Sequence, residues 1–473
     1  MPVSLPSDIY VQIFLHLDIP EILIIRTVCK EFQDLSYSRA IWRNRLQKRV
    51  IDAHIPTPGL QGQHLDSLTS QDLERLVQRA LTLRKNWTAE CPAAKRTADL
   101  PAVEPMHVIS LDFVQHGGRS LLVSHRLSTS ARPRVFHAHV WDLNVWPYKC
   151  IAERSWVQGE YRGKAVNISP AEGEAIMVVS NGENLEVLGL DSTTEDGFKV
   201  LRSVEAPAQP VQALSGSLAL LRHTHEPNVL RLLDIVNGQT DLKLQSLTAE
   251  PVRDVIITAE FVLLLKGTSL EFYALPTGTS RQGTLEPLQN FQWPWRVDHA
   301  KMALQAFTHT THVGAFPINI MIRFGSYFPW SINLLHRYEL RINPAYDSSK
   351  QIDQGNAPYD LPPLLQETIA SPIRLHATTD MVLGPYGTAV WIDSHTEDFF
   401  NHADRGQRLA GRLCPVRVGD GEEIELSDQV ATSTASSLYG IQEEDSWLQV
   451  AIDEVEGRIA VGSPEKIMIT EYI

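Results

Sequence analysis

The chain has 473 residues, 43% of them hydrophobic and 21% charged, and its formal net charge is −14, so we expect two or more domains of ordinary globular composition. Because phosphate contacts need clustered lysine and arginine, this acidity argues against a nucleic-acid partner. No window of 18 uncharged apolar residues is present, which argues against a membrane-spanning helix and hence a membrane partner.

Residues 1–50 have the pattern of a small helical module. Ile9, Ile13 and Leu17 recur at i, i+4 and i+8, which places them on one helical face. Pro20 stands where a second, strongly apolar helix would begin, and a third short helix follows. A unit of this size cannot bury so much apolar surface by itself. We therefore expect a second surface to cover it, either another protein or the rest of this chain.

A loop rich in proline and glycine comes next, and then the clearest helix of the chain. Residues 70–87 carry an apolar stripe that ends at Trp87, and Ser70 is a suitable N-cap. Acidic residues in the first turn and basic residues in the last turn complement the helix dipole. We assign residues 51–100 to a linker that contains this helix.

Short apolar runs separated by turn signals fill residues 101–473. Asn181-Gly182 and Lys266-Gly267 each divide two strand-like runs, as in a β-hairpin. Four groups of such runs start 45, 44 and 47 residues apart, which is the spacing of four-stranded propeller blades. The group starts that we assign are Val108, Val166, Val211, Val255, Met302, Ile373 and Leu438.

The expected fold class is therefore a small all-α module followed by an all-β domain. We expect a β-propeller of seven blades, with six or eight as alternatives, and two packed β-sandwiches would also produce many short strands. Residues 346–365 interrupt the series with three prolines and predict an inserted loop. The last strand, Ile467–Ile473, is expected to close the ring.

Residues 4–42 read SLPSDIYVQIFLHLDIPEILIIRTVCKEFQDLSYSRAIW, and this segment resembles the F-box family. The resemblance rests on a Leu-Pro start, an acidic residue two places later, a helix that ends in Leu-Asp, a Val-Cys-Lys sequence before an aromatic residue, and a closing tryptophan. Ile24 and Ile25 depart from the pattern, because the family often has a more polar residue there. The matching positions are Leu5, Pro6, Asp8, Ile9, Ile13, Leu17, Asp18, Leu23, Val28, Cys29, Phe32, Leu35 and Trp42.

This resemblance implies a partner. F-box modules dock onto a Skp-type adaptor, which links them to a cullin–RING ubiquitin ligase of the SCF type. Leu73–Trp87 looks like the linker helix of fungal F-box proteins that carry a WD-repeat-like propeller; the alternative is a helix that only caps the first blade. The residues that would contact the adaptor or pack the module are Leu5, Pro6, Ile9, Ile13, Leu17, Leu23, Val28, Cys29, Phe32 and Trp42.

The expected function is that of a non-enzymatic adaptor whose propeller binds a target protein, with no cofactor. Four widely spaced cysteines fit a reducing compartment, so we expect the cytoplasm or nucleus. One alternative is a scaffold that does not lead to degradation. Another is a propeller enzyme, which a deep central pocket with converging carboxylates would favour. The sequence contains no common catalytic or nucleotide-binding motif, such as GxSxG or a Walker loop.

Two further features of the β-rich region are candidate binding sites. Tyr327, Phe328 and Trp330 surround a proline in a predicted turn, where exposed aromatic residues would contact a substrate. Residues 420–456 hold 11 acidic residues and neither lysine nor arginine, so we expect solvated loops or a patch that steers a basic target.

Three histidine pairs could suggest metal ligands, but none has a third and fourth ligand at a standard spacing, and we expect no metal site. These pairs are His137 with His139, His223 with His225, and His309 with His312.

Overall fold

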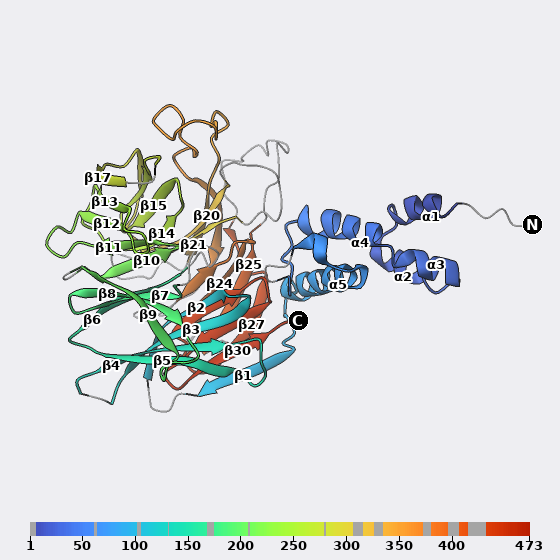
Figure 1. The fold of residues 1–473 in the computed structure, drawn as a ribbon, viewed down its shortest axis with the longest axis horizontal. Coiled ribbons are helices and arrows are strands. Elements are labelled where there is room, and N and C mark those ends of the chain that lie inside the picture. The colour runs from blue at the N-terminus through green and yellow to red at the C-terminus, as the bar shows by residue number, and fades with distance from the viewer. Residues whose placement is uncertain are drawn as a thin grey trace, which may run out of the picture.

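The chain folds into a helical module beside a ring of β-sheets (Figure 1). This computed structural model describes residues 6–60, 64–101, 106–130, 132–167, 175–206, 209–278, 281–305, 316–325, 334–371, 380–395, 406–414 and 432–473. The helices are α1 (Ser7–Phe14), α2 (Ile19–Ile25), α3 (Lys30–Ser36), α4 (Arg39–Leu46) and α5 (Ser70–Trp87), with a π-helical turn at Gln47–Ile51 and a 3-10 turn at Leu65–Ser67.

The strands of the described residues form seven sheets, and each sheet is one blade of a seven-bladed propeller. From the innermost strand outward, the first blade consists of β2 (Met106–His116), β3 (Arg119–Ser128), β4 (Val135–Asp142) and β5 (Lys149–Val157), and the second of β6 (Tyr161–Val166), β7 (Met177–Asn181), β8 (Asn184–Leu190) and β9 (Phe198–Glu205). The third blade consists of β10 (Val211–Ser215), β11 (Leu218–Arg222), β12 (Val229–Asp234), β13 (Thr240–Gln245) and β17 (Arg281–Leu285). The fourth blade consists of β14 (Val252–Ile257), β15 (Phe261–Lys266), β16 (Ser269–Ala274) and β18 (Gln289–Gln292).

The remaining three blades complete the ring. The fifth blade consists of β19 (Val297–Leu304), β20 (Ile318–Phe324), β21 (Leu334–Leu340), β22 (Leu364–Ala370) and β26 (Thr432–Ser433). The sixth blade consists of β23 (Met381–Leu383), β24 (Thr388–His395), β25 (Gly406–Leu413) and β27 (Ser437–Gln442). The seventh blade consists of β28 (Gln449–Asp453), β29 (Arg458–Gly462), β30 (Lys466–Glu471) and β1 (Arg96–Pro101).

The seventh blade closes the ring with both ends of the β-rich region. β30 pairs antiparallel with β29 and with β1, so the first strand after the helices becomes the outermost strand of the last blade. The prediction that the last strand closes the ring is thus confirmed. The first propeller strand begins at Arg96, five residues before the expected start of the β domain at residue 101.

Two local expectations were wrong. Leu438 does not start the last blade, because it lies in β27, which pairs with β25 and completes the sixth blade; the last blade starts at Gln449. The N-cap of α5 is Thr69 rather than Ser70, because the Thr69 side chain accepts a hydrogen bond from the Asp72 backbone N–H and completes a capping box.

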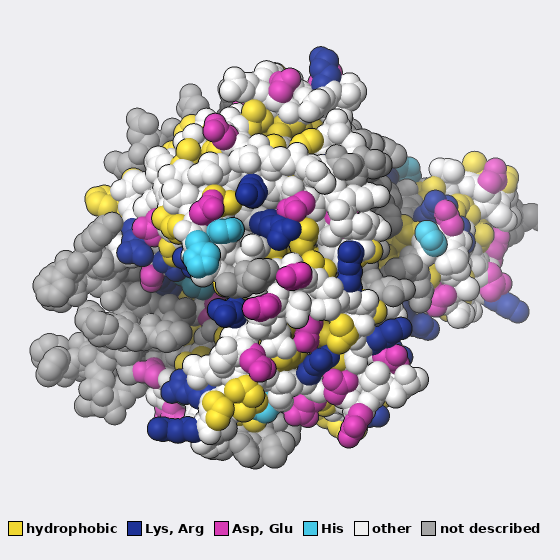
Figure 2. Space-filling model, turned by 60° about the vertical axis from the view of Figure 1, so that its left-hand side comes forward, with side chains coloured by type: hydrophobic (Ala, Val, Ile, Leu, Met, Phe, Trp, Pro, Cys, Tyr) yellow, Lys and Arg dark blue, Asp and Glu magenta, His cyan; other side chains and the backbone are white. Residues whose placement is uncertain are grey.

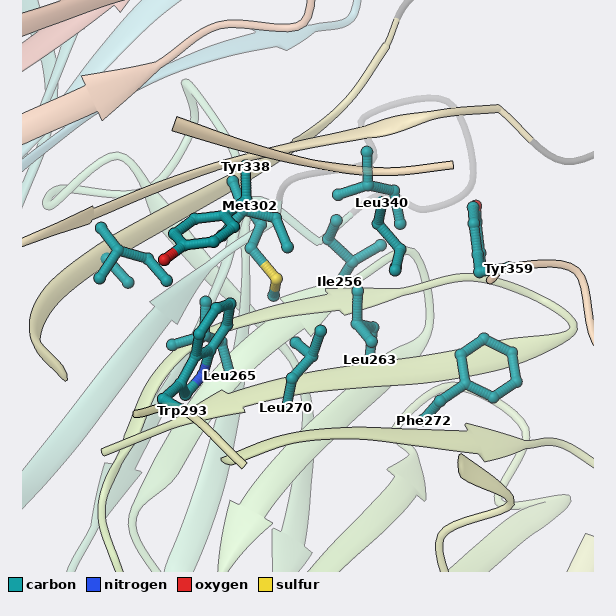
Figure 3. Close-up of a cluster of buried hydrophobic side chains, with 14 of the residues drawn as sticks. Ile256, Leu263, Leu265, Leu270, Phe272, Trp293, Met302, Tyr338, Leu340 and Tyr359 are labelled. Atoms are coloured by element: carbon teal, nitrogen blue, oxygen red, sulfur yellow. The ribbon is translucent and has the colours of Figure 1, made fainter. Parts of the chain in front are cut away.

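The hydrophobic core of the ring lies between neighbouring blades. Figure 3 shows the cluster in which side chains of β14, β15 and β16 meet those of β19 and β21. The connection at residues 341–363, where an inserted loop was expected, contributes buried Tyr359 to this cluster, and the Tyr359 ring packs edge-on against Phe261 and Phe272. Among the described residues, no helix is both long and apolar enough to cross a membrane.

Candidate functional site

The helical module has its own core, which α5 helps to build. Trp42 is fully buried at its centre, and its indole Nε1 donates a hydrogen bond of 2.9 Å to the Ser36 carbonyl. From α5, Leu73, Val77 and Ala80 pack into the same cluster. The module and the first part of α5 are therefore one folded unit.

Several large apolar side chains of this module remain outside the core. Ile9 and Ile13 on α1 are 43% and 44% exposed, and Ile24 and Val28 are both 66% exposed. Five of the fourteen large hydrophobic side chains that are exposed among the described residues lie between residues 9 and 37. Figure 2 shows hydrophobic side chains on the small lobe formed by this module. Such a concentration of exposed apolar side chains is typical of an interaction surface.

The predicted adaptor-binding residues divide into three groups. Of the ten, five are exposed: Pro6, Ile9, Ile13, Val28 and Cys29.

Leu17, Leu23 and Phe32 are half-buried, and of these Leu17 and Phe32 pack against the core. Trp42 is a core residue and has no accessible surface for a partner, which assigns it to packing. Leu5 lies outside the described residues.

Sequence reasoning missed two exposed residues of this surface. Ile24 was noted only as a departure from the family pattern, yet it is among the most exposed apolar side chains of the module. Tyr37 follows α3 and is 40% exposed, and the Arg26 guanidinium lies 4.3 Å from its ring centroid. An apolar residue at a position that is usually polar was the available signal for Ile24.

An ion pair fastens the module to α5. Arg26, which follows α2, donates hydrogen bonds of 2.8 and 2.9 Å to the two carboxylate oxygens of Glu74 and a third of 2.8 Å to Ser36 Oγ. Both side chains of the ion pair are largely buried. Bidentate arginine–carboxylate pairs fix orientation as well as distance, so α2 and α5 hold one relative position.

The C-terminal end of α5 enters a different core, that of the last two blades. Leu83 and Trp87 pack among strands β24, β25 and β28 to β30. The Trp87 ring lies 5.3 Å from the Tyr439 ring and 5.4 Å from the Tyr472 ring, and its Nε1 donates a 2.9 Å hydrogen bond to Thr388 Oγ1. The helix thus does not cap the first blade. It joins the module to the blades where the ring closes.

Carboxylates of the β28–β29 turn reinforce this junction. Glu456 accepts a 2.8 Å hydrogen bond from the Gly59 backbone N–H and lies 3.8 Å from Arg79 of α5. Glu454 is buried and accepts backbone hydrogen bonds of 2.7 Å from Tyr386 and from Thr388. Burial raises the pKa of Glu454 to about 7. These glutamates and Asp453 are buried structural groups, although the acidic run was expected to be solvated.

The rest of the acidic run behaves differently. Glu443, Glu444 and Asp445 are exposed in the connection between β27 and β28, as expected for solvated residues. The acidic residues between 420 and 428 lie outside the described residues. Tyr327, Phe328 and Trp330, the predicted substrate-binding residues, also lie outside them, so their role stays a prediction.

The innermost strands surround a central channel of about 1010 Å³, and carboxylates from several blades converge in it. Asp112, Asp254 and Asp380 surround Lys301, and the pKa of Lys301 is raised because the attraction of these carboxylates outweighs its burial. A central pocket with converging carboxylates, the feature that would favour a propeller enzyme, is therefore present.

Each of these carboxylates has a structural partner. Asp112 accepts from Lys164 at 2.8 Å, Asp254 from the Met302 backbone N–H at 2.5 Å, and Asp380 from the Val450 backbone N–H at 2.9 Å. Asp380 also lies 3.2 Å from His299 Nε2. These contacts connect strands of different blades and so help to hold the ring together.

Histidine pairs form no recognisable metal site in the described part of the chain. The His137 and His139 rings lie 6.1 Å apart, and those of His223 and His225 lie 6.3 Å apart. Across the described residues, no group of three or more His, Cys, Asp or Glu side chains is placed to hold a metal. His309 and His312 lie outside that part.

One family model and several solved structures are similar to parts of this chain. An F-box-like family model matches residues 3–48. No curated protein matches the chain. Similar solved structures include the WD40 domain of Pan2 from Neurospora crassa, with 9% identity, a TM-score of 0.42, and coverage of 81% of this chain and 97% of that one. Sqt1 from Chaetomium thermophilum has 11% identity and a TM-score of 0.41, and the match covers 79% of this chain and all of that chain.

Hsv2 from Kluyveromyces lactis has 9% identity and a TM-score of 0.30, with coverage of 65% of this chain and 90% of that one. The fold assignment rests on the seven sheets themselves.

Proposed function

We propose that this chain, an F-box-like domain followed by a seven-bladed propeller, is the substrate-recognition adaptor of an SCF-type ubiquitin ligase. In this proposal the helical module binds a Skp-type adaptor and the propeller binds the target protein. The observation that carries it is the exposure of Ile9, Ile13, Ile24 and Val28 on a module whose own core is already complete. The same proposal places the chain in the cytoplasm or nucleus.

A non-catalytic role follows from the same proposal. The chemistry of ubiquitin transfer belongs to other subunits, and this chain contributes proximity between target and ligase. The structural pairing of Asp112, Asp254 and Asp380 supports this role over that of a propeller enzyme, because no free acid–base pair is offered by these carboxylates.

The adaptor interface is tested with the full chain and a purified Skp-type adaptor. An Ile9→Asp/Ile13→Asp variant should weaken binding by about a hundredfold or more, because two apolar contacts are replaced by charges that must be desolvated. Ile441→Asp is the matched control, since Ile441 is 62% exposed on β27 of the propeller. Equal binding by wild type and the double variant, with unchanged circular dichroism, would reject the proposed interface.

The ligase role is tested in a eukaryotic cell. Mass spectrometry of proteins that co-purify with the wild type and with the double variant should show adaptor and cullin only with the wild type. Target proteins should remain bound to both. A propeller-bound protein that is never ubiquitinated in the assembled complex would instead support the non-degradative scaffold.

A further inference from the structure

The turn between β4 and β5 presents a tryptophan that the proposed adaptor role does not use. Val145 and Trp146 are each 53% exposed at the tip of this turn. The Arg96 guanidinium of β1 lies 4.6 Å from the Trp146 ring centroid, and Tyr148 packs edge-on at 5.2 Å. An exposed tryptophan held between an arginine and a second aromatic ring has the composition of a binding hot spot.

Hydrogen bonds fix the turn at both ends. Asn144 Oδ1 accepts from the Ser120 backbone N–H at 2.9 Å, and the Arg458 guanidinium donates to the Leu143 carbonyl at 3.3 Å. Tyr148 OH donates to Glu471 at 2.7 Å. The apolar tip is therefore held in place before any partner arrives, which reduces the entropy lost on binding.

The charge around the tip is positive, although the protein as a whole is acidic. The two carboxylates beside the turn are buried, and three arginines share them: Asp142 lies 3.7 Å from Arg119, and Glu471 lies 3.5 Å from Arg96 and 3.0 Å from Arg458. The basic side chains are exposed. We call the following residues the Trp146 surface: Lys95, Arg96, Arg119, Val145, Trp146 and Lys149.

This surface lies on the face of the propeller that carries the helical module. Arg458, which bonds the turn, follows Gly457, and Gly457 is in contact with Leu83 of α5. In an antiparallel blade the turns after the first and third strands lie on one face, which agrees with this contact.

We propose that the Trp146 surface is a second protein-binding site, for an acidic segment that carries an apolar anchor residue. Trp146 and Val145 receive the anchor, and the surrounding lysines and arginines receive the carboxylates. Charge complementarity selects this partner, because five cations around the turn outnumber its two carboxylates and the excess positive charge would repel a basic segment. These cations are Lys95, Arg96, Arg119, Lys149 and Arg458. The site does not depend on the proposed adaptor interface.

The test uses full-length protein labelled with 5-fluorotryptophan and followed by fluorine NMR. The probe is a short polyglutamate peptide with a central Leu-Phe pair, and its control has lysine in place of each glutamate. Trp146→Phe assigns one resonance, and Trp295→Phe assigns that of a matched tryptophan, 59% exposed, elsewhere on the propeller.

The acidic peptide should shift the Trp146 resonance in a saturable and salt-sensitive way and leave the Trp295 resonance unchanged. Lys95→Glu/Lys149→Glu should weaken this binding by about tenfold or more, because the local charge is lowered by four units without removing Trp146. The proposal would be overturned if both peptides caused equal shifts or if the Trp146 resonance did not shift. It would also be overturned if the shift depended only on protein concentration, because a second copy of the chain would then cover the surface.

Discussion

Trp87 is the residue on which the junction between module and propeller depends most. Its side chain is 5% exposed, and it contacts Tyr439 and Tyr472 as well as the Thr388 hydroxyl. Truncating a buried tryptophan to alanine costs about 3–5 kcal/mol through lost burial and the cavity that remains. The two aromatic contacts and the lost hydrogen bond put Trp87→Ala toward the upper part of that range.

The assay is equilibrium urea unfolding of the full chain, followed by near-ultraviolet circular dichroism. Trp295→Ala is the control, because an exposed tryptophan with the same loss of volume should change the free energy of unfolding by less than about 0.5 kcal/mol. If Trp87→Ala lowered the free energy of unfolding by less than about 1 kcal/mol, the reasoning would be refuted, because α5 would then lie on the propeller without sharing its core.

Three further predictions concern the same region. Gly457→Ala should destabilise the chain more than Gly182→Ala. Both positions have a positive φ, but only at Gly457 would an added Cβ come within 2.3 Å of Leu83 Cδ1. Thermal unfolding of both variants measures the difference. Deleting residues 466–473 removes β30, leaves β1 without its partner, and should lower the melting temperature, so that unchanged melting would disprove the role of the last strand. Because the pKa of Glu454 is raised from 4.5 to about 7, the folded state holds a proton that the unfolded state releases, and stability should fall as pH rises between these values; Glu454→Gln should flatten that part of the stability–pH curve.

Local patterns predicted the elements that local physics determines. The helix expected at residues 70–87 has these bounds in the structure, since its apolar stripe and end charges all favour one register. The hairpin at Asn181-Gly182 forms as expected, with Gly182 at φ +60°. Blade spacing predicted the right number of blades, although one blade start was misplaced at Leu438 and another, Ile373, lies outside the described residues.

Features that depend on distant parts of the chain were not predictable in the same way. Arg96–Pro101 has no signal that directs it to the last blade, because its partner β30 lies more than 360 residues away. The burial of Trp42 and the exposure of Ile24 are decided by how the helices pack around α5. A sequence motif specifies which residue stands at a position but not how deeply that residue is buried. From the sequence alone, the carboxylates of the β28–β29 turn are expected at the surface, because their burial depends on Gly59 and α5, which are distant in the chain.

The division of α5 between two cores predicts how the proposed ligase subunit would use it. This helix of 18 residues is about 27 Å long, and its first part belongs to the module while Leu83 and Trp87 belong to the propeller. A rigid link raises the effective concentration of a bound target at one place, whereas a flexible link spreads it over many. Inserting a Gly-Ser-Gly-Gly segment between Leu81 and Thr82 should leave adaptor binding and target binding unchanged, because each core keeps its own part of the helix. Ubiquitination of the bound target should slow, and an undiminished rate would show that the propeller needs no fixed distance from the ligase.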